Sequence, residues 1–283
     1  MMTHYLTEPL AFTEHQYALI DRVVVPQLPE VLPVIEVVSP LLAPQAHLYP
    51  WLLPLRELSS DVWSRLLNGA RLKTEPDSPP LFTLLLKSDL SPEAMKNVLV
   101  NALYLKEKQQ GHILRYYDPR VLFHLHWMMG PWVFSRRIAA DDITHWTFWL
   151  EGNWHTLAFP EKVRYQQGET SASFAQIQRI GLINQVLAQL PVTSDLAQRQ
   201  TLSRRIEALF DIAMTQWSLT DKQDLTAFAS HGVTLNDEFH QAPRMKELLG
   251  RCQHVTGYYQ RITHSWTDEQ WQEMTSKVRY LQL

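Results

Sequence analysis

The sequence predicts an α/β (α+β) N-terminal lobe with a small mixed sheet and crossover helices, followed by an all-α C-terminal lobe. Prolines and tryptophans are concentrated in the first 160 residues, whereas the rest of the chain has the pattern of capped amphipathic helices. Short, continuous apolar runs in the N-terminal part are typical of buried strands. With 283 residues, 45% of them hydrophobic, the chain can bury a sizeable core. We predict two lobes, 1–160 and 161–283, joined by a polar segment over 162–173.

The first lobe is predicted to contain a strand–helix–strand unit. The apolar run Leu81–Ser88 is bounded by prolines and an aspartate, which favours a buried strand. Ser91 and Pro92 then have the pattern of an N-cap and a first helical residue. Residues 112–117 follow as a second strand, so the unit is a crossover that would be right-handed if the strands are parallel. Tyr17–Asp21 is a third strand candidate.

A second helix is predicted to begin at Asp118 and Pro119. The carboxylate of Asp118 can accept free backbone N–H groups, and the N–H that proline lacks is not needed at a first helical position. Gly130 and Pro131 end this helix. Its core-facing stripe consists of Val121, Leu122, Leu125, Met128 and Met129.

An aromatic hairpin is expected over His145–Phe159, with its turn at residues 151–153, where Gly152 supplies positive φ. Alternation along the first strand would place Trp146 and Phe148 on one face and Trp149 on the other. One of these aromatic sets therefore needs a second cover, either from the chain's own core or from a partner.

The second lobe is predicted to be helical from its capping signals. Thr220 with Gln223, and Thr267 with Gln270, have the spacing of capping boxes. Gly232 is expected to close the helix that begins near Thr220. A packed helix is indicated over residues 202–217 by the stripe Leu202, Ile206, Leu209, Phe210, Ala213 and Trp217.

Composition excludes several classes of function. Lys and Arg total 26 against 29 Asp and Glu, a formal net charge of −3, and no segment concentrates basic residues, so nucleic acid is not an expected partner. Cys252 is the single cysteine, which excludes an internal disulfide, and the N-terminus has no obvious signal peptide, so we expect a cytoplasmic protein. No membrane span is expected, because the apolar stretch 31–55 is interrupted by Pro33, Pro40, Pro44, Pro50 and Pro54.

The polar and aromatic residues of 111–132 allow two interpretations. Opposite the core stripe of the predicted helix lie Arg120, Phe123, His124 and Trp127. In one interpretation the rest of the chain covers this face, and Arg115 and Arg120 hold Asp118 or a neighbouring carbonyl as structural pairs. In the other, the face binds a partner protein, because Trp, Tyr and Arg dominate interface hot spots.

Metal and catalytic chemistry are not expected. His124 and His126 lie two positions apart, which on a helix directs them about 200° apart, and neither His145 nor His155 has a carboxylate or cysteine at ligand spacing. The adjacent Asp141 and Asp142 suit a turn or a cap. No signature of a common enzyme class occurs, so we expect a non-enzyme without cofactor or metal. The alternative is a hydrolase or metal-dependent enzyme with an unrecognised pocket around His124, His126 and Asp141.

Five segments in order resemble one bacterial family: YALID from Tyr17, YPWLLPL from Tyr49, RYYDPRV from Arg115, GPW from Gly130 and WTFWLEGNW from Trp146. Together, over roughly residues 15–160, they are similar to the type VI secretion effector adaptors, also called the Tap family or effector chaperones. RYYDPRV is the most specific segment. Residues 22–36 depart from the family pattern, because three prolines replace a smooth helical stretch.

The resemblance implies a non-catalytic adaptor that binds a secreted toxic effector and loads it onto the VgrG spike. Its partners would therefore be the cognate effector and VgrG. Asp118 and Pro119 are expected to be structural. Combining the resemblance with the hot-spot residue types, we predict partner contacts by Arg115, Tyr117, Arg120, Phe123, Trp127, Trp132 and Trp149.

Overall fold

The computed structural model describes residues 5–28, 30–71, 79–107, 110–159, 162–169, 171–253 and 255–276. The chain forms two compact units, Met1–Ile177 and Gln178–Leu283. Sheets and helices make up the first unit, and the described part of the second is helical, so the predicted α+β lobe followed by an α lobe is confirmed. The polar segment 162–173 falls in the first unit, where Ala172 N donates to Met128 O (2.6 Å) and Glu169 Oε1 accepts from Trp132 N (2.6 Å).

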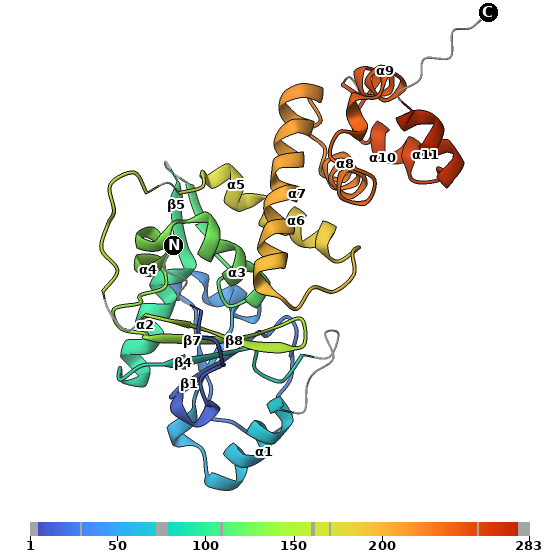
Figure 1. Ribbon diagram of the computed structural model, residues 1–283. Helices are drawn as coiled ribbons and strands as arrows, with labels where there is room; N and C mark the ends of the chain where they lie inside the picture. Colours follow the sequence, from blue (N-terminus) through green and yellow to red (C-terminus); the bar gives the residue numbers. More distant parts are fainter. Residues whose placement is uncertain are drawn as a thin grey trace, which may run out of the picture. The chain divides into compact units, whose positions relative to one another are not determined.

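A six-stranded sheet forms the centre of the first unit, in the order β2-β3-β1-β4-β7-β8 (Figure 1). All of its pairings are antiparallel. β1 is central, and its Leu19 lies opposite Leu52 of β3 and Leu84 of β4. The strands are β1 (Tyr17–Ile20), β2 (Ile35–Glu36), β3 (Trp51–Pro54), β4 (Leu84–Lys87), β7 (His145–Leu150) and β8 (Asn153–Ala158).

Both faces of this sheet are covered, which explains why its central strands are continuous apolar runs. On one face, Ala18 and Ile20 pack in a cluster with Leu67 and Ala70 of α1 (Ser60–Arg71). On the other face lie α3 (Pro119–Met128) and α4 (Pro131–Arg137), which Figure 1 shows across the sheet from α1. All four residues of β1 are buried as a result.

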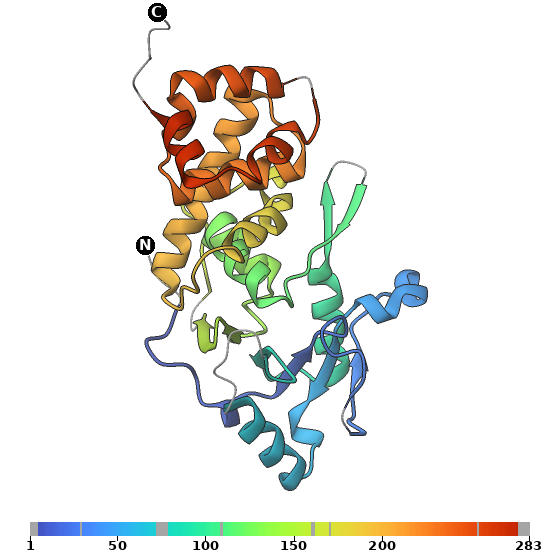
Figure 2. The same cartoon turned by 90° about the vertical axis from the view of Figure 1, so that its right-hand side faces the viewer.

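The predicted crossover unit is wrong in its second strand. β4 and α2 (Pro92–Leu103) form as expected, and Ser91 caps α2. The chain then enters β5 (Tyr104–Glu107), which pairs with β6 (Gln110–Ile113) as a separate antiparallel ribbon, visible apart from the sheet in Figure 2. β6 ends before Arg115, because residues 114–118 turn: Asp118 N donates to Arg115 O (3.0 Å).

The start of α3 confirms the predicted cap. The side chain of Asp118 accepts from Arg120 N, Pro119 is the first helical residue, and Gly130, with φ of 73°, separates α3 from α4. The remaining short helices of this unit are η1 (Phe12–Glu14), η2 (Pro40–Leu48), η3 (Leu55–Glu57) and α5 (Phe174–Gln178), the last of which ends one residue into the second unit.

The aromatic hairpin is also confirmed. Leu150 of β7 pairs with Asn153 of β8, so Glu151 and Gly152 form a two-residue turn. Both have positive φ, 52° and 82°, as a type I′ turn requires. The sequence identified the glycine but not the strained conformation of Glu151.

The second unit contains α6 (Ile180–Leu187), α7 (Leu196–Trp217), α8 (Lys222–Thr234), η4 (Phe239–Gln241), α9 (Pro243–Cys252), α10 (Tyr258–Thr263) and α11 (Asp268–Thr275). The capping box of Thr267 and Gln270 is confirmed at α11. The box at Thr220 is wrong: Asp221 caps α8, because its carboxylate accepts from both Gln223 N and Asp224 N.

Gly232 lies inside α8 and does not end it, contrary to the prediction. A Cβ added there would lie 2.6 Å from Leu209 of α7. The glycine therefore permits the close approach of α7 and α8, because any larger residue would displace that leucine.

Candidate functional site

Residues of the segments YALID and RYYDPRV meet at one end of the sheet. Asp21 follows β1, and its Oδ2 accepts a hydrogen bond from Arg115 Nη2 at 3.1 Å, although 94 residues separate them. Oδ1 of the same carboxylate accepts from Val23 N at 2.9 Å. The side chain of Asp21 is 8% exposed and that of Arg115 45% exposed, so the carboxylate is buried and the guanidinium reaches the surface.

The two tyrosines of RYYDPRV hold this segment in place through hydrogen bonds to backbone carbonyls. Tyr116 Oη donates to Leu99 O (2.9 Å) and Tyr117 Oη donates to Leu48 O (3.0 Å). Burial raises the pKa of both phenols, so they act as neutral donors. The guanidinium of Arg115 lies over the Tyr117 ring, 5.5 Å from its centroid. Tyr117 is thus covered by the chain and supports Arg115.

Asp118 and Arg120 form a second ion pair of the same type. Arg120 donates through Nε to Asp118 Oδ1 (3.0 Å) and through Nη2 to Oδ2 (2.8 Å), a bidentate geometry. The carboxylate side chain is 9% exposed and the guanidinium 56% exposed. The hydrogen bond to Asp118 raises the pKa of Arg120, as do the nearby carboxylates of Asp21 and Glu151.

Exposed apolar side chains lie on the segments that contact the partners of these arginines. Val23 and Val24, two and three residues after Asp21, are exposed. Leu48, whose carbonyl accepts from Tyr117 Oη, is exposed as well. We define the arginine face as Val23, Val24, Leu48, Arg115 and Arg120. A continuous series of contacts through Asp21, Tyr117 and Asp118 connects its members.

A third motif segment lies beside this face. Trp51, in YPWLLPL, begins β3, and the guanidinium of Arg22 lies 4.4 Å from its ring centroid. Arg22 also donates to Glu36 Oε1 (2.7 Å) and to Ala46 O (2.9 Å). Three of the five quoted segments therefore meet around the end of β1.

The structure buries several residues that were predicted to contact a partner. Phe123 is 1% exposed, and Trp149 is buried within β7, so the expectation that Phe123 lies on an open face is wrong. α3 packs on the sheet, and its buried residues lie on more than one side of the helix. The amphipathic pattern, with one buried and one exposed side, does not predict this. Trp127 is partly buried, and its Nε1 donates to Nδ1 of the buried His124 (3.2 Å).

Trp132 is the predicted aromatic anchor that does reach the surface. It is 38% exposed and makes an edge-to-face contact with Tyr165, with ring centroids 5.8 Å apart. Its contacts are separate from those of the arginine face. The predicted partner residues thus divide into two exposed arginines, one exposed tryptophan, and the largely covered side chains of Tyr117, Phe123, Trp127 and Trp149.

The residues of the alternative enzyme pocket lie in separate environments. The ring of His124 contacts Phe123 and Trp127, whereas that of His126 contacts Tyr5 and Phe134. Asp141 is exposed and pairs with Arg136 (2.9 Å). Within the described ranges, no group of three or more His, Cys, Asp and Glu residues is arranged to hold a metal.

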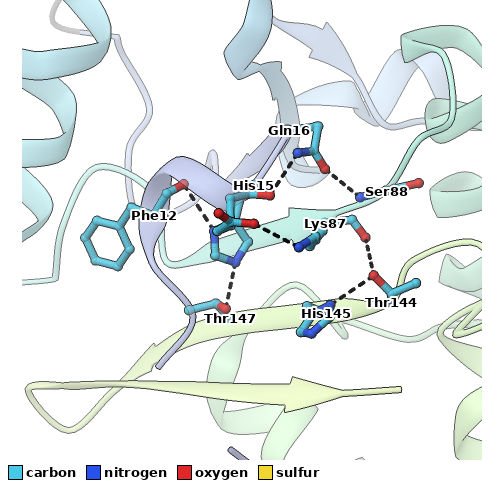
Figure 3. Close-up of polar contacts among 9 residues, drawn as sticks. Phe12, His15, Gln16, Lys87, Ser88, Thr144, His145 and Thr147 are labelled. Carbon is cyan, nitrogen blue, oxygen red and sulfur yellow. Dashed lines mark hydrogen bonds and ion pairs between the residues drawn. The ribbon is translucent and has the colours of Figure 1, made fainter. Parts of the chain in front are cut away.

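The opposite end of the sheet contains a polar cavity of about 500 Å³. Lys87 pairs with Glu14 (3.0 Å) at its wall. Gln16 Oε1 accepts from Ser88 N (2.9 Å), as Figure 3 shows. Four carboxylates line the cavity, with two cations: Glu14, Asp89, Asp141 and Asp142, with Arg56 and Lys87.

A buried polar network lies beneath this cavity. His15 contacts Thr147 Oγ1 through Nε2 (2.8 Å) and Phe12 O through Nδ1 (3.2 Å), as Figure 3 shows. Thr147 Oγ1 also contacts Thr156 Oγ1 (2.7 Å). Burial lowers the pKa of His15 to about 4. The network fixes the segment before β1 onto β7 and β8, so its role is structural.

Sequence reasoning missed the cavity and the part that Asp21 plays. The polar residues of the cavity come from segments far apart in the chain, and no local pattern connects them. Asp21 did carry a signal, because an aspartate that ends an apolar strand must find donors if it is buried. Its partner, Arg115, could not be named without the tertiary structure.

No protein-family model, curated protein or solved structure matches this chain. Among the described residues, no helix is both long enough and apolar enough to cross a membrane.

Proposed function

We propose that this protein is a type VI secretion adaptor that acts in the cytoplasm, binds a cognate effector and delivers it to the VgrG spike. The function is binding, with no catalytic step. The proposal rests on the family resemblance of residues 15–160. One observation supports it: the motif residues Asp21 and Arg115 are in direct contact and hold a guanidinium at the surface.

The composition of the arginine face is suited to protein recognition. Arginine is enriched at interface hot spots, because its planar group forms several hydrogen bonds and covers apolar surface with its stem. Exposed valine and leucine side chains beside the arginines supply area that is removed from water when a partner binds. The buried carboxylates fix the arginines beforehand, which reduces the entropy lost on association.

Co-expression with the products of the neighbouring genes tests the proposal. The tagged chain is expressed with each neighbour in turn, and complexes are isolated by affinity and size-exclusion chromatography. We expect a stable complex with a large secreted protein, with a VgrG-type spike protein, or with both. If neither gene lies nearby, or if neither product binds the folded chain, the proposed function is wrong.

A further inference from the structure

The arginine face has a chemical preference that the proposed function does not specify. Arg115 interacts electrostatically with both Asp21 and Asp118, and Arg120 interacts with the same two carboxylates. Both arginines lie at the turn before α3, where Arg115 O accepts from Asp118 N (3.0 Å) and the Asp118 carboxylate pairs with Arg120. Neither carboxylate side chain is more than 9% exposed, so the two guanidiniums meet solvent while their anionic partners do not. The carboxylate of Glu151, which also acts on Arg120, is only partly buried.

Each guanidinium retains donors for a ligand. Arg120 uses Nε and Nη2 for Asp118, and its Nη1 makes no hydrogen bond to the described residues. Arg115 reaches Asp21 through Nη2 alone in its ion pair. An arginine carries five N–H donors in a rigid plane, and carboxylates match that geometry in a bidentate manner. Each arginine can thus donate to a further carboxylate without displacing its existing pair.

We infer that the arginine face binds an acidic segment of a partner protein, in which carboxylates alternate with apolar side chains. The carboxylates bind Arg115 and Arg120, and the apolar side chains cover Val23, Val24 and Leu48. This assignment deepens the proposed function, on which the identity of the partner as effector or spike depends. The chemistry of the segment follows from the face itself.

Defined peptides test the inference directly. Three fluorescein-labelled peptides of equal length carry the same leucines, with glutamate, glutamine or lysine at the intervening positions. Fluorescence anisotropy with the full chain measures their affinity. We expect the glutamate peptide to bind at least about tenfold more tightly than the other two, and increasing salt to weaken its binding. Equal binding of all three peptides, or preferred binding of the lysine peptide, would overturn the inference.

Variants then locate the site. Val23→Glu and Val23→Lys change the charge of the face without touching either ion pair. We expect Val23→Glu to weaken binding of the glutamate peptide about tenfold and Val23→Lys to strengthen it. The double variant Arg115→Gln/Arg120→Gln should abolish binding, with Arg136→Gln as the matched control, because Arg136 is exposed and pairs with Asp141 away from this face.

The outcomes separate this inference from the proposed function. If neighbouring gene products bind wild type and Val23→Glu equally and the glutamate peptide does not bind, the adaptor function stands and the inference is wrong. If the peptide binds through the arginine face but no neighbouring product does, the inference stands and the adaptor function is wrong. Because Val23 is exposed, its variants remain informative even if the double arginine variant fails to fold.

Discussion

The two ends of the six-stranded sheet differ in how deeply the carboxylates of their ion pairs are buried. At the arginine face, Asp21 and Asp118 are nearly inaccessible, whereas Arg115 and Arg120 are about half exposed. At the cavity end, the carboxylate is the more exposed partner: the side chain of Glu14 is 52% exposed and that of Lys87 34% exposed. β1 connects the two ends, from Gln16 to Asp21, over roughly 17 Å.

This difference shows that the charge exposed to solvent depends on which member of an ion pair is buried. The number of charged residues in a segment does not determine it alone. A buried carboxylate holds its arginine in place, and the arginine presents its remaining donors outward. An exposed pair such as Glu14 and Lys87 contributes little to stability, because water screens both charges. The arginine face is therefore preorganised, whereas the exposed ion pair of the cavity end is adaptable.

The largest expected effect concerns the support of the arginine face. Phe123 lies on α3, which Asp118 caps and whose first turn contains Arg120, and it is 1% exposed. Phe123→Ala should lower the stability of the first unit by about 3–5 kcal/mol, because it removes a buried aromatic ring. Chemical denaturation followed by tryptophan fluorescence measures this change. A stable variant that loses only partner binding would restore Phe123 as a contact residue.

Acid should destabilise the cavity end through His15. His15 has a pKa of about 4 in the folded chain against 6.5 when exposed, because burial disfavours its charged form. Its contribution, at most about 3 kcal/mol, is complete above pH 6.5 and is lost as pH falls toward 4, since the unfolded chain then binds the proton more readily.

The variant His15→Gln isolates this dependence. We expect its thermal midpoint to be lower than that of wild type at pH 7 and the difference to narrow at pH 4.5. The variant keeps some acid sensitivity, because burial also lowers the pKa of His155 to about 4. A constant difference between the two proteins across this pH range would show that His15 does not resist protonation.

A matched pair of substitutions compares the two ends. Asp21→Asn keeps an oxygen for Val23 N but places an amide opposite Arg115, which removes a charge-assisted hydrogen bond worth about 2 kcal/mol. Glu14→Gln makes the same chemical change in an exposed pair, so its thermal midpoint should remain close to that of wild type. Equal shifts of the two thermal midpoints would contradict the expectation that the buried ion pair contributes more to stability than the exposed one.

How far the sequence predicts this structure depends on the distance over which each signal acts. Asp118 with Pro119, Gly152, and Thr267 with Gln270 were identified correctly, because caps and turns are set by residues within a few positions. The second strand of the crossover was wrong. An apolar run such as 112–117 does not specify whether it pairs within a sheet or turns to bury its tyrosines.

The candidate site was predicted in part for the same reason. Its arginines were identified from residue type, and both reach the surface. Phe123 was assigned to an open face because helical periodicity describes one buried stripe, and it cannot show that further segments cover the other side. Asp21 and Leu48 lie far from Arg115 in the sequence, so only the tertiary structure reveals their contacts.

The cap of α3 allows a smaller test of the arginine face. Asp118→Ala should cost about 1 kcal/mol or more, because the variant loses the acceptor for Arg120 N and the anchor of the guanidinium. Asp118→Asn keeps the cap but loses the charge, so it should be more stable than the alanine variant. If the two midpoints coincide, the ion pair and not the cap is the stabilising element.

The smallest expected effect is at Trp132, which contacts Tyr165 and Glu169 and belongs to neither the arginine face nor the lining of the cavity. Its ring is 38% exposed and contacts the exposed ring of Tyr165, and its backbone N–H, which donates to Glu169, is unchanged by substitution. Trp132→Ala should therefore change the free energy of unfolding by less than about 1 kcal/mol. We also expect unchanged affinity for the acidic peptide, because Trp132 makes no contribution to the arginine face. Loss of a partner protein from this variant at a normal thermal midpoint would instead identify Trp132 and Tyr165 as a second binding surface, separate from both ends of the sheet.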